Sequence, residues 1–169
     1  MPARSSSPPS RAGTDATELL RADHGEVQAL FERYRKLARA GAAPDERRPL
    51  AEEICTLLTV HAALEEEIFY PALRGAGLAA DLLDEAEVEH ASAKELIAQI
   101  RDMEADAPLY DAKVGVLGEY VAHHVVEEED KLFPKCRAAT LDLHALGRRL
   151  AARKEELMSE MSEGMEVLG

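Results

Sequence analysis

The sequence contains one short phrase twice. It reads HAALEEEIFYP over residues 61–71 and HVVEEEDKLFP over residues 124–134. Each copy places a histidine four residues before a glutamate and ends at a proline. Two further histidines, His24 and His90, each follow an acidic residue and precede the two copies by similar intervals. This spacing predicts two similar helical hairpins that are joined in tandem.

Apolar residues recur every three or four positions in four long segments, which is the period of an α-helix. The segments are separated at GAAP, at GAG and around Pro108, so we expect helices near residues 15–40, 46–74, 79–105 and 109–138. Because the connections are short, consecutive helices should be antiparallel neighbours. The sequence therefore predicts an all-α protein, an up-down-up-down four-helix bundle with an additional C-terminal helix.

The bundle is expected to occupy residues 15–138. Residues 1–14 are rich in Ser, Pro and Arg and should be disordered, because they cannot bury enough apolar surface to fold. Residues 139–169 should form an amphipathic helix and a tail. One face of this helix carries Leu143, Leu146, Leu150, Leu157 and Met161. Such a face can pack on the bundle or bind a protein partner or a second copy of the chain.

The composition restricts the partners and the compartment. A net charge of −13 argues against binding to nucleic acid or to anionic membranes, and favours cations instead. The two cysteines form no CxxC pair, which is typical of a reducing compartment. No apolar run has membrane-spanning length, and residues 1–13 lack the apolar core of a secretion signal. We therefore expect a cytoplasmic protein.

The histidines and glutamates of the repeat predict a metal site. Residues four apart on a helix lie about 40° apart around its axis, so each histidine and the following glutamate point in one direction. Such pairs are commonly exposed ion pairs. Here the histidines fall within the apolar stripes, and buried carboxylates without a cation cost on the order of several kcal/mol each. The expected metal ligands are His24, His61, Glu65, His90, His124 and Glu128.

Imidazole and carboxylate ligands suit iron, manganese or zinc. Two carboxylates that reach in from opposite hairpins suit a bridged pair of ions better than a single ion. Two iron ions with an oxo or hydroxo bridge would balance the charge. The ferritin-like alternative uses Glu-x-x-His twice, whereas this chain has that spacing only at Glu87 and His90. The sequence assigns no catalytic residue.

The ordered set DH at 23–24, HAALEEEIFYP, EH at 89–90 and HHVVEEEDKLFP resembles the hemerythrin-like, or HHE cation-binding, family. The resemblance covers roughly residues 18–138. It implies a four-helix bundle around a non-haem di-iron centre. In that centre the four histidines would be terminal ligands, and Glu65 and Glu128 would be bridging ligands.

Three departures from the family pattern refine the expected function. Reversible oxygen carriers of this family have a histidine at the position of Lys94 and an aspartate at the position of Glu128. Relatives that repair iron–sulfur centres often have a cysteine in an N-terminal segment, and this chain has none there. We therefore expect a di-iron protein that binds or reacts with O2, peroxide or NO.

Two alternatives come from other functional classes. One is an iron store or sensor that signals metal or oxygen status through the C-terminal helix. The other is a helical interaction module without metal.

Several polar residues near the repeat are expected to lie outside the site. His123 belongs to the polar face of its helix, and Tyr120 is expected to serve in packing. Pro71 and Pro134 should kink or end their helices, because proline lacks the backbone N–H. The residues expected at the solvated surface are Glu66, Glu67, Lys94, Glu129 and His144.

Overall fold

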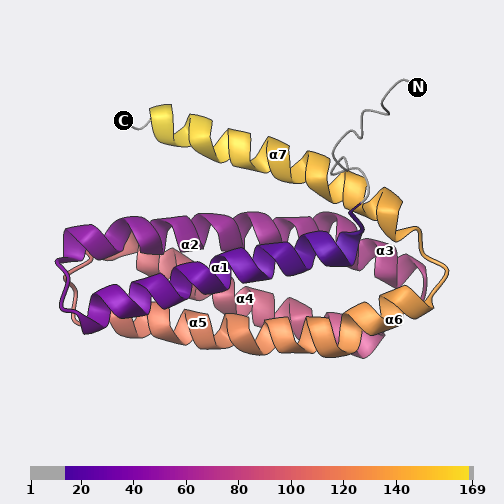
Figure 1. The fold of residues 1–169 in the computed structure, drawn as a ribbon, viewed down its shortest axis with the longest axis horizontal. Helices are drawn as coiled ribbons and strands as arrows, with labels where there is room; N and C mark the ends of the chain where they lie inside the picture. The colour runs from indigo at the N-terminus through magenta and orange to yellow at the C-terminus, as the bar shows by residue number, and fades with distance from the viewer. Residues whose placement is uncertain (1–13, 168–169) are drawn as a thin grey trace, which may run out of the picture.

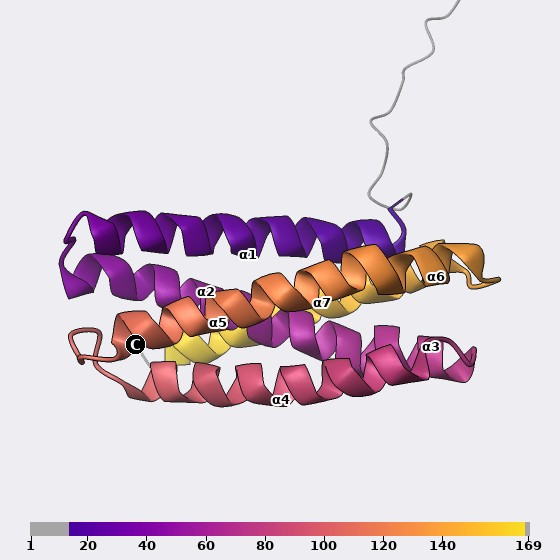
Figure 2. The same ribbon diagram turned by 90° about the horizontal axis from the view of Figure 1, so that it is seen from below.

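The computed structural model describes residues 14–167, in which every regular element is helical. The chain forms an antiparallel bundle of four long helical stretches, and one further helix lies across it (Figures 1 and 2). The elements in order are α1 (Ala16–Arg39), α2 (Pro44–Leu64), η2 (Glu65–Phe69), α3 (Tyr70–Gly75), α4 (Ala80–Asp102), α5 (Tyr110–Glu127), η3 (Glu128–Leu132), α6 (Phe133–Ala138) and α7 (Leu143–Val167). The predicted all-α class and bundle architecture are confirmed. The disorder expected for residues 1–14 falls outside the described residues, apart from Thr14.

Local signals in the sequence set the helix boundaries. Asp15 caps α1 in a capping box, in which its side chain accepts from the backbone of Glu18 and the Glu18 side chain accepts from the backbone of Asp15. The turn after α1 contains Gly41 at φ 68°, and the turn before α4 contains Gly77 at φ 69°. Glycine adopts this left-handed backbone conformation without a steric penalty. The break at GAAP therefore becomes the turn of the first hairpin, and the break at GAG becomes the turn that joins the two hairpins.

The repeated phrase forms a π-helical turn in each hairpin. The backbone N–H of Tyr70 bonds to the carbonyl of Glu65, five residues earlier, and Phe133 bonds to Glu128 in the same way. The prolines that follow do not end the helices, because α3 and α6 continue beyond them to Gly75 and Ala138. The interruption that the sequence predicts at each proline is therefore a single widened helical turn before the proline, after which the helix continues. Single π-turns of this kind are frequent at functional sites.

The bundle has two hydrophobic clusters with a polar layer between them. One cluster surrounds Phe31, Ile54 and Leu117, and the other surrounds Leu20, Phe69 and Phe133. The buried polar residues His24, His90 and Glu128 lie between the two clusters along their helices, and Glu65 is buried close to them. Packing on both sides therefore fixes the position of this layer.

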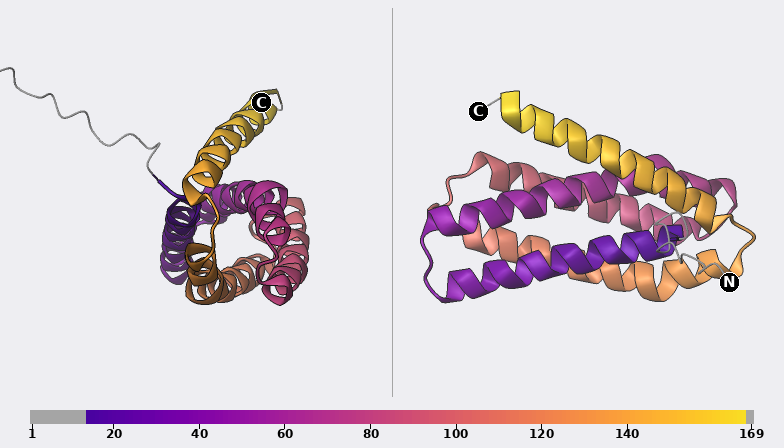
Figure 3. Two further views of the ribbon diagram at one scale, coloured as in Figure 1. Left: turned by 90° about the vertical axis from the view of Figure 1, so that its right-hand side faces the viewer. Right: turned by 45° about the horizontal axis from the view of Figure 1, so that its top comes forward.

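The helix α7 packs across α1 and α2, and its C-terminal end points away from the bundle (Figures 1 and 3). Leu146 and Leu150 are buried in the second cluster, and Leu143, Leu157 and Met161 pack against it. The predicted amphipathic face is therefore the face that covers the bundle. Gly147 permits close approach, since a Cβ atom there would lie 2.4 Å from the backbone oxygen of Thr14.

Two further expectations concern the cysteines and the membrane. Cys55 and Cys136 are free and buried, and they belong to different hydrophobic clusters. Among the described helices, none is both long enough and apolar enough to cross a membrane.

Candidate metal centre

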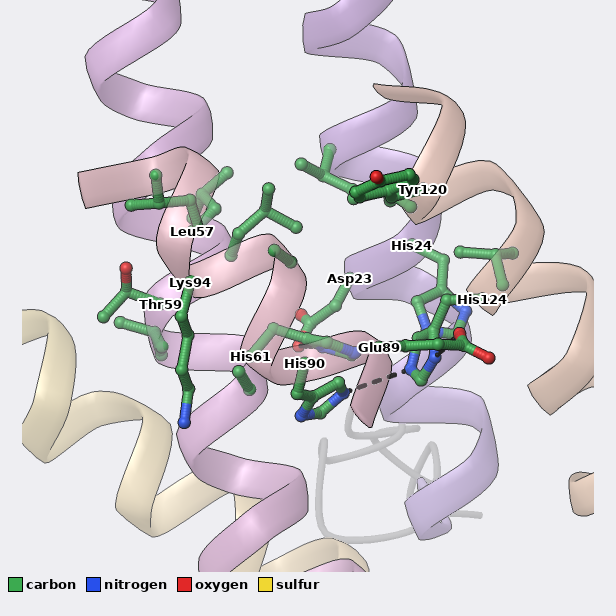
Figure 4. A pocket seen from close by; sticks show the side chains of 18 of the residues that line it. Asp23, His24, Leu57, Thr59, His61, Glu89, His90, Lys94, Tyr120 and His124 are labelled. Carbon is green, nitrogen blue, oxygen red and sulfur yellow. Dashed lines mark hydrogen bonds and ion pairs between the residues drawn. The ribbon is translucent and has the colours of Figure 1, made fainter. Parts of the chain in front are cut away.

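The structure brings together all six residues that the sequence singled out. They form two groups, each with two histidines and one glutamate whose ligand atoms lie within 4.8 Å of one another. His24 and His61 are grouped with Glu128, and His90 and His124 are grouped with Glu65. Figure 4 shows the four imidazole rings directed toward a common region from four different helices. Each group has the donor set expected for one metal ion.

The two glutamates link the groups. Oε1 of Glu65 lies 3.2 Å from Nε2 of His61 on its own helix and 3.2 Å from Nε2 of His90 in the other hairpin. Oε1 of Glu128 lies 3.1 Å from Nε2 of His124 and 3.2 Å from Nε2 of His24 across the bundle. Each carboxylate therefore stands between the histidines of both hairpins, in the position that a bridging ligand occupies.

The environment of Glu65 fits a cation. Its side chain is fully buried, and neither of its oxygens accepts a hydrogen bond of suitable geometry. Nε2 of His61 is likewise buried without a hydrogen-bond partner, although it lies 3.2 Å from Glu65. Buried polar atoms are almost always satisfied in folded proteins. A metal ion between these atoms would satisfy both of them.

The pKa values of the centre reflect close opposite charges. Burial lowers the pKa of His61, but Glu65 and Asp23 outweigh burial and raise it to about 10. Burial is likewise outweighed at His124, where Glu128, Glu65 and Glu89 raise the pKa to about 12. Burial raises the pKa of Glu65, but the opposing effect of His61 holds it well below its usual range. The metal-free layer therefore holds protons that metal ions would displace.

A second set of carboxylates faces the outer ring nitrogens. Asp23 lies 3.1 Å from Nδ1 of His61, and Glu89 lies 3.0 Å from Nδ1 of His124. These are the acidic residues that precede His24 and His90 in the sequence. In each hairpin the acidic residue of the first helix therefore contacts the histidine of the second helix. Such contacts fix the tautomer and the orientation of a metal-binding imidazole.

His24 and His90, the histidines on the first helix of each hairpin, also face carboxylates. Sequence reasoning expected these carboxylates to be solvated. Glu129 lies 3.3 Å from Nδ1 of His24, and Glu66 lies 3.5 Å from Nδ1 of His90. Their side chains are only 26% and 35% exposed. The expectation of a solvated carboxylate is therefore wrong for Glu129, whereas Glu66 is exposed, as expected, and also faces His90. Glu66 directly follows Glu65 and Glu129 directly follows Glu128, and the widened turn directs each toward the neighbouring histidine.

Tyr70 is a residue of the candidate site that sequence reasoning missed. Its hydroxyl donates to Oε2 of Glu128 at 3.1 Å and lies 3.3 Å from Nε2 of His124. Burial, Glu65 and Glu128 raise the pKa of Tyr70 well above its usual value, so the phenol is neutral. In a regular α-helix Tyr70 would point away from Glu65, five residues earlier. The π-turn brings Tyr70 and Glu65 to the same face of the helix. The sequence could have predicted this position of Tyr70 only if the π-turn itself had been predicted.

The second copy of the phrase has Phe133 at the position of Tyr70. The Phe133 ring stacks on His24, with a centroid distance of 6.1 Å and an interplanar angle of 2°. The Tyr70 ring lies 5.5 Å from that of His90. The rings beside the histidines therefore differ, a phenol at His90 and a hydrocarbon ring at His24, although the Tyr70 hydroxyl also contacts Glu128 of the His24 group.

Cations surround the outer carboxylates. Lys154 of α7 donates to Asp23 at 2.6 Å, Lys94 donates to Glu66, and Nε of Arg21 lies 3.5 Å from Glu129. Lys94 is a surface lysine, as expected, with 55% of its side chain exposed. The contact from Lys154 connects α7 to the ligand layer through Asp23 and His61.

The remaining residues lie away from the ligands. The side chain of His123 is 68% exposed. Glu67 pairs with Arg153 at the surface, and His144 is exposed. Tyr120 is 46% exposed and lies at the edge of a cavity, away from the ligand nitrogens (Figure 4). His123 thus occupies the polar face that sequence reasoning gave it.

A cavity of about 280 Å³ adjoins the ligand layer on the side of the first hydrophobic cluster (Figure 4). All four histidines contribute to its wall, together with aliphatic residues of α1, α2, α4 and α5. Its lining includes the exposed residues Glu26, Lys94 and Arg101, so the cavity reaches the surface. Small molecules can therefore approach the histidines from solvent.

Comparison with known proteins agrees with this geometry. The family model of the hemerythrin HHE cation-binding domain matches residues 15–136. The crystal structure of a hemerythrin HHE cation-binding domain-containing protein from Mycobacterium kansasii has a TM-score of 0.75 and 23% identity, covering 90% of this chain and 93% of that chain. This likeness supports the fold.

Two further relatives are similar in sequence. A protein of Mycobacterium bovis, described as uncharacterised, is 27% identical over 146 residues, which cover 85% of this chain and 87% of that protein. A protein of Nostoc sp. named DNA nickase is 32% identical over 123 residues, covering 71% of this chain. This matched part is 33% of the Nostoc protein. The family match over most of the chain, with the His and Glu groups at its centre, shows that the protein belongs to the hemerythrin HHE cation-binding domain family.

Proposed function

We propose that the protein is a cytoplasmic non-haem di-iron protein whose iron pair binds or reacts with O2, peroxide or NO. The observation that carries this proposal is the sharing of Glu65 and Glu128 between two pairs of histidines. Two separate metal sites would need only one carboxylate each, in contact with the histidines of one hairpin. Two carboxylates that each contact both hairpins fit a bridged pair.

The residues of the chain would hold the two ions as two groups. His24 and His61 would bind one ion, His90 and His124 would bind the other, and the two glutamates would bridge them. A pair of iron ions supplies two electrons through its ferrous and ferric states. The chain contributes orientation, because the outer carboxylates hold the imidazole rings and the two hydrophobic clusters hold the helices.

Among the three ligands, the geometry favours peroxide. Tyr70 places a neutral phenol O–H beside His90 and His124, and Phe133 offers no such group at His24. Peroxide cleavage requires protons at the oxygens, whereas reversible binding of O2 does not. Tyr70 can donate a hydrogen bond to such an oxygen, and the proton itself would come from water that enters through the cavity, because the raised pKa makes the phenol a weak acid. The cavity supplies the access route.

Metal analysis and peroxide consumption together test the proposal. Protein purified without added metal should contain about two iron ions per chain and show a near-ultraviolet charge-transfer band. Supplied with ascorbate to reduce the ferric pair, it should consume hydrogen peroxide, and Tyr70→Phe should lower the rate about 10²-fold without loss of iron, the usual scale of one hydrogen-bond donor that stabilises developing charge. Tyr110→Phe removes the hydroxyl of a buried tyrosine away from the site, and it should change neither the rate of peroxide consumption nor the iron content. Iron-free protein, or a Tyr70→Phe variant with an unchanged rate, would contradict the proposal.

The second candidate is an iron store or sensor that signals through α7. It is favoured by the contact of Lys154 with Asp23, which in turn faces His61. Bound iron without peroxide turnover, together with a change in the exposure of α7 on metal loading, would support this function. Hydrogen exchange of α7 with and without metal measures the change.

DNA nicking is named for the Nostoc relative, and we do not propose it for this chain. The shared part is a third of that protein, and the net charge of −13 disfavours contact with phosphates.

A further inference from the structure

The cavity beside the ligand layer is larger than the proposed small ligands require. About 10–15 Å³ of comparable volume holds one water molecule, and an apolar cavity of roughly 150 Å³ holds benzene. The cavity here is about 280 Å³, close to twice the benzene-binding size. It also approaches the lower limit of pockets that bind small organic molecules, roughly 300 Å³. Its size therefore fits a molecule of roughly eight to ten carbons.

The walls of the cavity are aliphatic along most of its length. These side chains come from all four helices of the bundle, and they are Val27, Leu57, Leu58, Ile97, Val121 and Val125. Thr59 adds a hydroxyl, but this hydroxyl already donates to the backbone oxygen of Cys55 at 2.7 Å. Apolar walls favour an uncharged hydrocarbon chain, because burying a charge there carries a large desolvation penalty.

The histidines and the carboxylates that face them lie together at one end of the cavity. The four histidines, Asp23 and Glu89 form this end, and Figure 4 shows Leu57 and Tyr120 at the opposite side of the view. The charged side chains of Lys94 and Arg101 are exposed where the cavity meets solvent. An occupant should therefore have one polar head group directed toward the histidines and an apolar body that extends away from them.

We propose that the cavity binds a straight-chain aliphatic molecule with one uncharged oxygen-bearing head group. The head group lies at the histidines, and the carbon chain lies among Leu57, Ile97 and Val121. The inference deepens the proposed function, because alkyl hydroperoxides are the members of this class that a peroxide-reactive centre would use. Hydrogen peroxide alone would leave most of the aliphatic wall without contacts.

The binding site is tested with n-octanol. Like an alkyl hydroperoxide of similar length, it has a straight carbon chain and a head-group oxygen, but it has no O–O bond. Isothermal titration calorimetry on the protein as purified should show binding of n-octanol. Each buried CH2 group contributes about 0.8 kcal/mol, so n-butanol should bind on the order of a hundredfold more weakly. Ala93 lines the cavity, and Ala91 is exposed on the same helix. Ala93→Leu should weaken n-octanol binding at least tenfold, whereas Ala91→Leu should leave it unchanged.

A second measurement locates the ligand without a variant. In crystals soaked with an octanol that has a bromine on its last carbon, anomalous scattering should place the bromine near Ile97, away from the histidines. Bromine elsewhere, no binding of n-octanol, or equal affinities of the wild type and Ala93→Leu would overturn the inference. Peroxide consumption distinguishes the two proposals. A protein that consumes hydrogen peroxide but does not bind n-octanol retains the proposed function, and one that binds n-octanol without peroxide reaction retains only the binding site.

Discussion

The carboxylate of Asp23 lies 3.1 Å from Nδ1 of His61, and its other oxygen accepts a hydrogen bond from Lys154. Asp23 precedes His24 in the sequence, yet it contacts His61 of the next helix. Glu89 repeats this relationship with His124 at 3.0 Å. The pattern of acid followed by histidine is thus explained by contacts between the two helices of each hairpin.

Asp23→Asn should weaken metal binding roughly 10–100-fold, because the amide orients His61 less strongly and makes it a less basic ligand. Competition with a chromophoric chelator measures the affinity. Asp106→Asn, at an exposed position in the loop before α5, is the matched control and should bind metal as the wild type does. Equal affinities of the wild type and Asp23→Asn would refute a role for Asp23 at the centre.

Glu65→Gln and Glu128→Gln should each reduce the metal content by half or more, because each removes a charged ligand shared by the two ions. Elemental analysis of the purified variants gives the content. Glu67→Gln changes an exposed residue of the same turn that pairs with Arg153, and it should retain all metal. Two ions per chain in both ligand variants would disprove the bridging assignment.

His123 and His124 test the register of α5. His124 contacts Glu128 and Glu89, whereas the side chain of His123 is 68% exposed. His124→Ala should therefore lose metal and lower the melting temperature of the metal-loaded protein, since metal that binds only the folded state stabilises it. His123→Ala should keep the metal content and the melting temperature of the wild type. The reverse result would place the wrong face of α5 in the core.

The metal-free protein should lose stability as the pH rises above neutrality. The folded-state pKa values of His61 and His124, about 10 and about 12, exceed the ordinary value of 6.5. Their contribution to stability is therefore complete below pH 6.5, and it decreases as the pH rises from 6.5 through the folded-state values. The lowered pKa of Glu65 contributes stability above its ordinary 4.5, and this is lost as the pH falls. Urea denaturation of metal-free protein should therefore give a higher midpoint at about pH 6 than at about pH 9.

Metal loading should release protons from the same histidines, which an indicator dye in weak buffer detects. Stability that stays constant or increases between pH 6.5 and pH 9 would contradict the assigned protonation, because in this range the unfolded-state histidines lose their protons while His61 and His124 of the folded protein keep theirs.

Gly147→Ala should destabilise the packing of α7, because its Cβ would lie 2.4 Å from the backbone oxygen of Thr14. The expected loss is about 1–3 kcal/mol of unfolding free energy, as for other overpacked contacts. Gly115→Ala is the control, since no atom lies within 4 Å of a Cβ there. It should stabilise α5 by up to about 1 kcal/mol, the helix propensity difference. Thermal denaturation compares the two, and equal melting temperatures would argue against close packing of α7.

The sequence by itself determined the helices, their order and the six residues that meet in the core. A period of three to four residues and glycine-containing turns are local properties, so they can be seen without the structure. The position of His24, His61, His90 and His124 within apolar stripes was sufficient to direct them inward, because burial of the stripe fixes the rotation of each helix.

Only the tertiary structure decided which carboxylate faces which histidine, and that Tyr70 joins them. The direction of Tyr70 depends on a π-turn, whose hydrogen bond from residue 70 to residue 65 replaces the regular spacing. Glu66 and Glu129 follow the same altered turns, so an assumed α-helix did not predict their contacts with His90 and His24. The contact from Lys154 to Asp23 joins residues far apart in the chain. Such contacts depend on how helices pack and where their spacing changes, and no local pattern encodes them.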